Sequence, residues 1–295
     1  MPYVSQIKSI NGIISWQLEL SGIYKDPHKT GQISFSNLDV DIMQLDNKIS
    51  GLSGIGKLNN NFLWFNDMTA TLSNKTESNS IGSQFAKLLM NKNNVNDNNN
   101  IMITGSMDLN SFFNPHYAIK MNGKNAYVQS TIGQVEGDVD FDIFVTGRDS
   151  LSITGKIIPE SNFTFYDILY KDNIRIDDVN AKYINYDIEL DLINGVRLYS
   201  HPVNCYLDGN IMITSQGQDD WKYSGMVEII NGTFTYNGND FSNAAGSIIL
   251  NPINYPYVDI SAQTQLYDND IEVAFTGYTN NPNLSIQSSD QEHFY

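Results

Sequence analysis

Hydrophobic and polar residues alternate with a period of two along most of the chain. The stretch 137–147, GDVDFDIFVTG, places Val139, Phe141, Ile143 and Val145 on one side of an extended backbone and three aspartates on the other. Similar alternation recurs in 16–20, 33–35, 211–213, 258–262 and 271–275. A period of two with one polar side is typical of antiparallel strands whose sheet is wet on one face.

Turn residues separate these alternating runs. The dipeptide Asn-Gly, the strongest short hairpin signal, occurs at 11–12, 122–123, 194–195, 231–232 and 237–238. With the remaining turn signals, the pattern predicts roughly 16–18 strands. The sequence therefore predicts an all-β chain.

One segment departs from the period of two. Ile81, Phe85, Leu88 and Leu89 fall at helical spacing, so we expect one short amphipathic helix over about 80–91. The tract that follows, NKNNVNDNNN at 91–100, has no side chains able to form a core and predicts a flexible linker. The domain division that this predicts is an N-terminal β region at 1–75, a helix and linker at 76–100, and a longer β domain at 101–295.

Glycine recurs inside the alternating runs, in units such as ITGSMDL (103–109), VEGDVDF (135–141), LDGNIMI (207–213) and YSGMVEI (223–229). In each unit the glycine has the same parity as the apolar residues, so it lies on the apolar face. Glycine inside a strand marks a bulge, a bend or the close approach of another molecule. Two interpretations follow: a recurrent bulge that curls the sheet, or slots along the apolar face for a ligand.

Composition narrows the classes of partner. The chain has 295 residues, 17 Lys and Arg against 33 Asp and Glu, and a formal net charge of −16. This balance argues against nucleic acid as a partner and against charge-driven docking on anionic lipid headgroups. No apolar run approaches the roughly 18 residues of a membrane helix, and the first residues do not resemble a signal peptide. We therefore expect a soluble chain.

Candidate chemistry is sparse. Asp138, Asp140 and Asp142 alternate in one strand, about 6.8 Å apart, without the turn glycine of a calcium loop, which predicts a solvated face. The four histidines are scattered, with no ligands at metal-binding spacing. Cys205 is the only cysteine, which excludes a disulfide scaffold, and it alternates as a small apolar residue. The sequence predicts no catalytic residue, no metal site, no cofactor and no enzyme.

The C-terminal region, from about Tyr223 to Ser289, contains five short motifs in series. They are Gly232-x-Phe234-x-Tyr236 followed by Phe241; Gly246-x-Ile248; Pro256-x-Val258-Asp259-Ile260-x-Ala262; Ile271-x-Val273-x-x-x-Gly277; and Pro282-x-Leu284-x-Ile286-x-Ser288. In order and spacing these motifs resemble a known family, the C-terminal domain of TamB, the translocation and assembly module protein of the AsmA-like group. The segment WQLELSGIYKDPHKTGQISFSN at 16–37 is similar in style to the repeats of the same family.

The resemblance implies a long curved antiparallel sheet forming a taco-like trough, polar outside and apolar inside. Members of the family are thought to carry phospholipid across the periplasm between the inner and outer membranes, and were first linked to outer-membrane protein assembly. The residues themselves favour a trough, because an apolar face running over many strands is too large to leave wet. The expected lipid-groove residues, taken from parity, are Val139, Phe141, Ile143, Val145, Ile211, Ile213, Val227, Ile229, Ile248, Leu250, Val258, Ile260, Ile271, Val273 and Phe275.

The sequence also departs from the family. The N-terminal membrane anchor of TamB-like proteins is absent, and the chain stops at DQEHFY, where the family continues into a segment that docks on an outer-membrane barrel. We therefore expect a fragment of a longer periplasmic protein that bridges the two membranes, with phospholipid as partner and an outer-membrane barrel as partner of the full-length protein.

Two other functions stay open. The first is an assembly factor for outer-membrane β-barrel proteins and autotransporters that templates an incoming strand at its sheet edge. The second is a structural β-solenoid with a closed, packed interior, although solenoid repeats usually keep a fixed period.

Overall fold

The computed structural model describes residues 7–43, 45–73, 99–111, 114–130, 134–166, 184–200, 203–217, 220–236, 238–266 and 269–288. Every regular element in these ranges is a β-strand, and 17 strands are present there. The predicted all-β, mostly antiparallel fold is confirmed. The predicted helix over about 80–91 lies outside the described residues, as does most of the linker that follows it.

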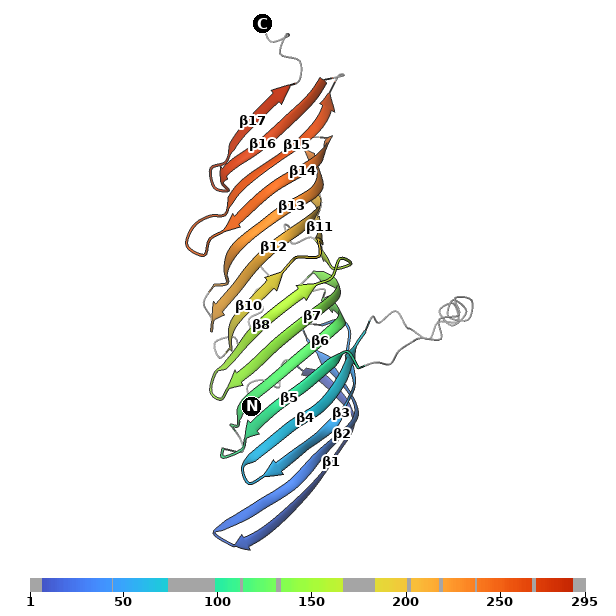
Figure 1. Cartoon of the computed structure of the whole chain (residues 1–295), viewed down its shortest axis with the longest axis vertical. Helices are drawn as coiled ribbons and strands as arrows, with labels where there is room; N and C mark the ends of the chain where they lie inside the picture. Colours follow the sequence, from blue (N-terminus) through green and yellow to red (C-terminus); the bar gives the residue numbers. More distant parts are fainter. Residues whose placement is uncertain are drawn as a thin grey trace, which may run out of the picture. The chain divides into compact units, whose positions relative to one another are not determined.

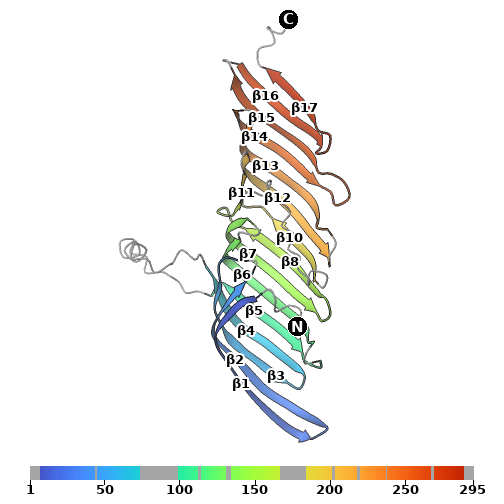
Figure 2. The same ribbon diagram turned by 180° about the vertical axis from the view of Figure 1, so that it is seen from behind.

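Two compact units make up the chain. Unit 1 comprises Met1–Gly133 and Val139–Ser152, and unit 2 comprises Gln134–Asp138 and Ile153–Tyr295. The predicted division at 76–100 stays a prediction. Figure 1 and Figure 2 show that the strands of each unit are bent along their length.

Unit 1 is an antiparallel meander in which each strand from β1 to β6 pairs with the next. Its strands are β1 (Ile7–Ile23), β2 (Asp26–Ile42), β3 (Ile49–Asn59), β4 (Phe62–Leu72), β5 (Ile101–Asp108), β6 (His116–Ser130) and most of β7 (Val135–Gly147). Because β4 pairs directly with β5, the sheet continues across the interval 74–98.

The core of unit 1 lies on one face of this meander. Leu63, Phe65 and Met68 of β4 are buried there, against partly buried apolar side chains of β2, β3 and β5. Towards β1 the same face opens, and Trp16 is 73% exposed. Burial therefore depends on having strands on both sides, which β1 lacks within unit 1, where it pairs with β2 alone.

Asparagine side chains close the strand ends of unit 1. Asn47 is buried, donates to the carbonyl oxygens of Ser73 and Tyr127, and accepts from the Gln129 amide. Asn100 bonds both backbone groups of Leu72 across the interval before β5. These bonds satisfy backbone groups that the ladders leave unpaired, which gives the asparagine-rich turns a structural role.

Unit 2 begins with interrupted strands and continues as a regular antiparallel meander from β12 to β17. Its strands are β8 (Leu151–Pro159), which starts at the boundary, β9 (Thr164–Tyr166), β10 (Ile184–Asp191), β11 (Val196–Ser200), β12 (Val203–Gln216), β13 (Lys222–Tyr236), β14 (Asn239–Leu250), β15 (Tyr257–Leu266), β16 (Asn269–Tyr278) and β17 (Asn283–Ser288).

The interruption lies between β10 and β11. The two short strands pair with successive halves of β12, and β11 also pairs in parallel with β9. Leu192 and Val196, on either side of the break, are fully buried. A left-handed glycine, Gly195 with φ of +71°, makes the turn between them.

Candidate functional site

The register of unit 2 gathers apolar side chains on one face. In antiparallel pairs, directly opposite residues point to the same side of the sheet. Val227 lies opposite Ile248, which lies opposite Val258, so one apolar row crosses three strands. A second row runs through Ile229, Gly246, Ile260, Phe275 and Leu284 across β13 to β17. We call this side of β10 and β12–β17 the apolar face.

Charge separates the two sides of unit 2 completely. Within β10 and β12–β17, the apolar face carries no Asp, Glu, Lys or Arg. The opposite side, which we call the acidic face, carries one lysine, Lys222, and nine carboxylates: Asp187, Glu189, Asp191, Asp208, Glu228, Asp240, Asp259, Asp270 and Glu272. Such a division places the acidic side in water and leaves the apolar side to be covered.

Eleven of the expected groove residues lie on this apolar face. They are Ile211, Ile213, Val227, Ile229, Ile248, Leu250, Val258, Ile260, Ile271, Val273 and Phe275. Val227 and Val273 are buried, and the other nine are half-buried. The face is thus partly open along its length, and its role as a groove lining stays a prediction.

The other four expected residues belong to unit 1. Val139, Phe141, Ile143 and Val145 share one side of β7, where Val139 is buried and the other three are half-buried. The Phe141 ring occupies the space above Gly123, where a Cβ would overlap it. The structure therefore distributes the fifteen residues over both units.

The best-packed part of the apolar face is only partly covered by the expected groove residues, which include Val273 and omit Phe241, Ala244 and Ala262. Phe241, Ala244, Ala262 and Val273 form a buried cluster in unit 2, and Phe234 packs against it. The rings of Phe234 and Phe241 are stacked, with centroids 4.6 Å apart and 3° between their planes. The Asn237-Gly238 hairpin signal could have found this pair, because a two-residue turn at that site places Phe234 opposite Phe241.

The in-strand glycines contact neighbouring strands. Gly246 has a φ of +145°, and a Cβ there would lie 2.7 Å from Cα of Ile260 on the adjacent strand. Glycines 105, 209 and 225 also have positive φ and would likewise meet backbone of a neighbouring strand, and a Cβ on Gly137 would meet the backbone of Phe163, just before β9. The space at these glycines is filled by the sheet itself, which favours the interpretation of a bending device over that of ligand slots.

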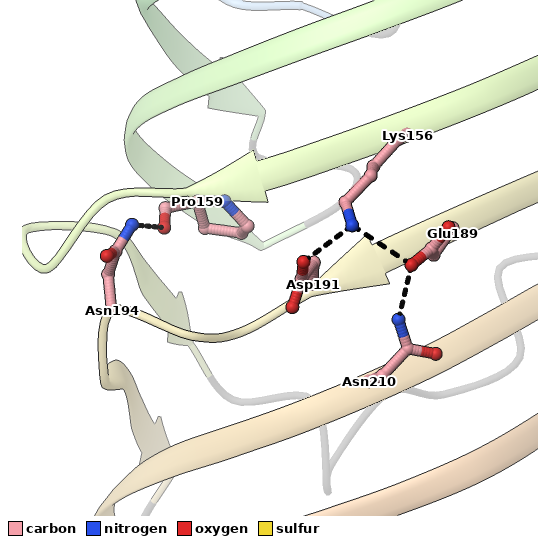
Figure 3. A network of polar contacts seen from close by, with 6 residues as sticks. All are labelled: Lys156, Pro159, Glu189, Asp191, Asn194 and Asn210. Carbon is pink, nitrogen blue, oxygen red and sulfur yellow. Dashed lines mark hydrogen bonds and ion pairs between the residues drawn. The ribbon is translucent and has the colours of Figure 1, made fainter.

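A polar network on the acidic face joins the interrupted strands (Figure 3). Lys156 on β8 forms ion pairs with Asp191 at 2.7 Å and Glu189 at 3.1 Å, both on β10. Asn210 on β12 donates to the same Glu189 oxygen at 2.7 Å. The bonds to Asp191 and then Glu189 raise the pKa of the Lys156 ammonium. The network has a structural role, because the two carboxylates share one cation and the contacts link β8, β10 and β12.

Reactive groups are few in the described part of the chain. Cys205 is buried on the apolar face, and desolvation raises the pKa of its thiol to about 11, so the reactive thiolate is scarce at neutral pH. No group of three or more metal-ligating side chains occurs within the described ranges. What this region offers chemically is apolar surface.

Comparison with protein families shows to which family the chain belongs. The model of the TamB C-terminal domain matches residues 91–291, more than half of the chain. The chain belongs to the TamB C-terminal domain family. No curated protein matches the chain.

Membership of the TamB family supports a general assignment. This is a family of non-enzymatic transport and assembly modules of the cell envelope. The apolar face of unit 2 lies entirely within the matched range. Among the described residues, no helix has the length and apolar character needed to cross a membrane.

Proposed function

We propose that this protein binds phospholipid acyl chains on its apolar face and carries them across the periplasm between the inner and outer membranes. The observation that carries the proposal is the uncharged apolar face of unit 2, which crosses β10 and β12–β17 and is partly open, since nine of its eleven expected groove residues are half-buried. Contiguous apolar surface of this extent marks a binding site for another molecule.

The dimensions of the face suit an acyl chain. Seven neighbouring strands, at about 4.8 Å spacing, extend over roughly 29 Å. A hydrocarbon core of about 30 Å assigns roughly 15 Å to the chains of one leaflet. The acyl chains of one lipid therefore fit along the sheet beside the rows of valine, isoleucine and phenylalanine, with no buried charge to desolvate.

The two faces of β14 provide a matched test. Ile248 lies on the apolar face and Ile249, which is 45% exposed, lies on the acidic face of the same strand. The full chain and its Ile248→Asp and Ile249→Asp variants are secreted into the periplasm, purified without detergent and extracted for lipid mass spectrometry. We expect stoichiometric phospholipid in the parent chain and in Ile249→Asp, and at least a tenfold loss in Ile248→Asp. A folded parent chain without lipid, or equal retention in both variants, refutes the proposal.

One observation favours strand templating as a second candidate function. Strand β1 is 17 residues long, nearly all of its side chains are exposed, and within unit 1 it pairs with β2 only. Its outer edge offers backbone groups to an incoming strand, which is the basis of β-augmentation. A fluorescent peptide with the alternating pattern of an outer-membrane strand should bind the chain, and Gly12→Pro and Ser15→Pro variants test whether β1 is the site. If binding is unchanged in both, templating at β1 is excluded.

A further inference from the structure

The two ends of the strands in unit 2 differ in chemistry. The connections 217–221, 251–256 and 279–282 join alternate hairpins of the meander, so they lie at the same end of its strands, along one edge of unit 2 in Figure 1. Exposed aromatic and aliphatic side chains gather at this end. We define the aromatic rim as Trp221, Ile253, Tyr255, Tyr257 and Tyr278, all of which are exposed.

Described polar side chains lie at the opposite end of the same strands. Asp240 and Asp270 are found there, at the starts of β14 and β16. A hollow of about 420 Å³ near this end is lined by amides and carboxylates, including Gln263, Gln265 and Glu272. Both ends are built from the same strands. The aromatic rim therefore results from the residues that occupy the connections at its end, and not from the geometry of the sheet.

The most exposed residues of the aromatic rim lie on a rigid loop. In 251–256, NPINYP, the side chain of Ile253 is 89% exposed and that of Tyr255 is 62% exposed. The Ile253 amide donates to Oδ1 of Asn251, and prolines at 252 and 256 restrict the backbone. A hydrophobic loop that is already held in one conformation loses little conformational entropy when it binds to another molecule or to a membrane.

Ring contacts and backbone bonds hold the rest of the rim in place. Tyr257 and Tyr278 pack edge to face with centroids 5.5 Å apart, and Trp221 packs on Tyr186 at 4.9 Å. The Thr279 amide donates to the Pro256 carbonyl oxygen, which joins the second connection to the third. The rim therefore presents a fixed row of amphipathic rings around an aliphatic tip.

We propose that the aromatic rim inserts into the interfacial region of a neutral lipid bilayer. Tyrosine and tryptophan favour this region because their rings are apolar and their hydroxyl and indole groups hydrogen-bond to headgroups and water. The loops 251–256 and 279–282 contain no charged residue, and the connection 217–221 contains Asp219 and Asp220 but no basic residue, so attraction to anionic headgroups plays no part. The nine carboxylates of the acidic face disfavour an anionic surface. The inference rests on the proposed function, because a lipid carrier must meet a bilayer to load and unload.

Vesicle flotation tests this assignment with the full chain. We expect the chain to float with phosphatidylcholine vesicles and to bind several-fold less when a third of the lipid is phosphatidylglycerol. Ile253→Asp and Tyr255→Ser should each weaken binding to phosphatidylcholine vesicles, roughly tenfold or more for Ile253→Asp because an isoleucine inserted in the bilayer is replaced by a charge. Tyr206→Ser, which removes an exposed aromatic ring from the acidic face away from the rim, is the matched control and should bind as the parent chain does.

The outcomes separate this inference from the proposed function. Loss of vesicle binding in Ile253→Asp, with phospholipid still co-purifying and an unchanged circular dichroism spectrum, supports insertion of the aromatic rim into the bilayer. Equal binding of parent and Ile253→Asp, or no binding by the parent chain, overturns it whether or not lipid co-purifies. If Ile253→Asp instead converts a parent dimer into a monomer in sedimentation and leaves vesicle binding unchanged, the rim is a contact between copies and the bilayer assignment is wrong. Vesicle binding through the rim by a chain that holds no lipid refutes the proposed function alone.

Discussion

The apolar and acidic faces of unit 2 are formed by the same strands, but all the charged residues of these strands lie on the acidic face. Neighbouring residues on β14 illustrate the contrast, because Gly246 and Ile248 belong to one face and Ser247 and Ile249 to the other. The apolar face has glycine beside large aliphatic and aromatic residues, whereas the acidic face has carboxylates, hydroxyls and amides. The comparison teaches that strand parity alone separates an uncharged apolar face from a face that carries the charged residues of these strands.

The largest expected effect on stability is at the stacked pair of the apolar face. Phe241 is buried against Phe234, so Phe241→Ala should lower the free energy of unfolding by about 3–4 kcal/mol through a cavity and lost ring packing. Tyr206→Ala, on the acidic face, should change it by less than about 0.5 kcal/mol. Urea denaturation measures both, and similar costs at the two sites would remove the distinction between the faces.

The next effect concerns the buried thiol. The pKa of Cys205 is raised from 9.0 to about 11 by desolvation, so the folded protein holds its proton more tightly than the unfolded chain does. This contribution to stability is present below pH 9 and is lost as the pH rises towards 11, at a cost of roughly 2–3 kcal/mol. Tyr117 and Tyr223, whose pKa values burial also raises, act in the same direction. The free energy of unfolding is therefore measured against pH for the parent chain and for Cys205→Ala, and the two curves are subtracted. If the difference does not change between about pH 8 and pH 11, the buried position of the thiol is contradicted.

A third comparison uses adjacent small residues on β14. Gly246→Ala should cost about 2 kcal/mol, because a Cβ at a φ of +145° would press on the backbone of β15, which cannot move aside. Ser247→Ala on the acidic face should stay within about 0.5 kcal/mol. Thermal unfolding of the two variants checks this, and a neutral Gly246→Ala would show that the glycines have no part in bending the sheet.

The smallest effect is expected on the acidic face, in the network of Lys156. The ion pairs of Lys156 with Asp191 and Glu189 are partly exposed, with 40% of the Lys156 side chain in contact with solvent, and salt screens pairs that reach solvent. Lys156→Met should lower the melting temperature slightly at low ionic strength, and the difference from the parent chain should disappear at about 1 M salt. A large drop that persists in salt would mean that the network contributes more than exposed charges do.

Much of the fold could be predicted from the sequence because strand parity is local. Once Val258 and Ile260 alternate with Asp259, their common face is decided within the strand. Asn-Gly is a poorer guide: the dipeptides at 194–195 and 237–238 fall between strands, but the hairpin turns predicted at 11–12, 122–123 and 231–232 are wrong, because these dipeptides lie inside β1, β6 and β13. The interrupted strands could not be predicted. The parallel pairing of β9 with β11 and the contact of Lys156 with Glu189 join residues more than 30 positions apart, and neither leaves a periodic signal.

The candidate site, too, could be predicted only where it depends on the local alternation of residues within a strand. Parity alone places eleven expected groove residues on one face of unit 2, but it could not show that the other four belong to a separate unit. Nor could it show that the glycine positions are filled by neighbouring backbone, because that depends on the φ angles and on the approach of the next strand. Ala244 was missed because alanine gives little hydrophobic signal in a pattern.

The most direct measurement of the central claim is a photocrosslinking scan along β14. A photoreactive phenylalanine is placed at positions 247, 248, 249 and 250 in turn, in the full chain expressed in the periplasm, and phospholipid adducts are quantified by mass spectrometry. The two-residue period of a strand predicts adducts at 248 and 250 and none at 247 and 249. Adducts of equal yield at all four positions, or adducts only at 247 and 249, would contradict the assignment of lipid to the apolar face.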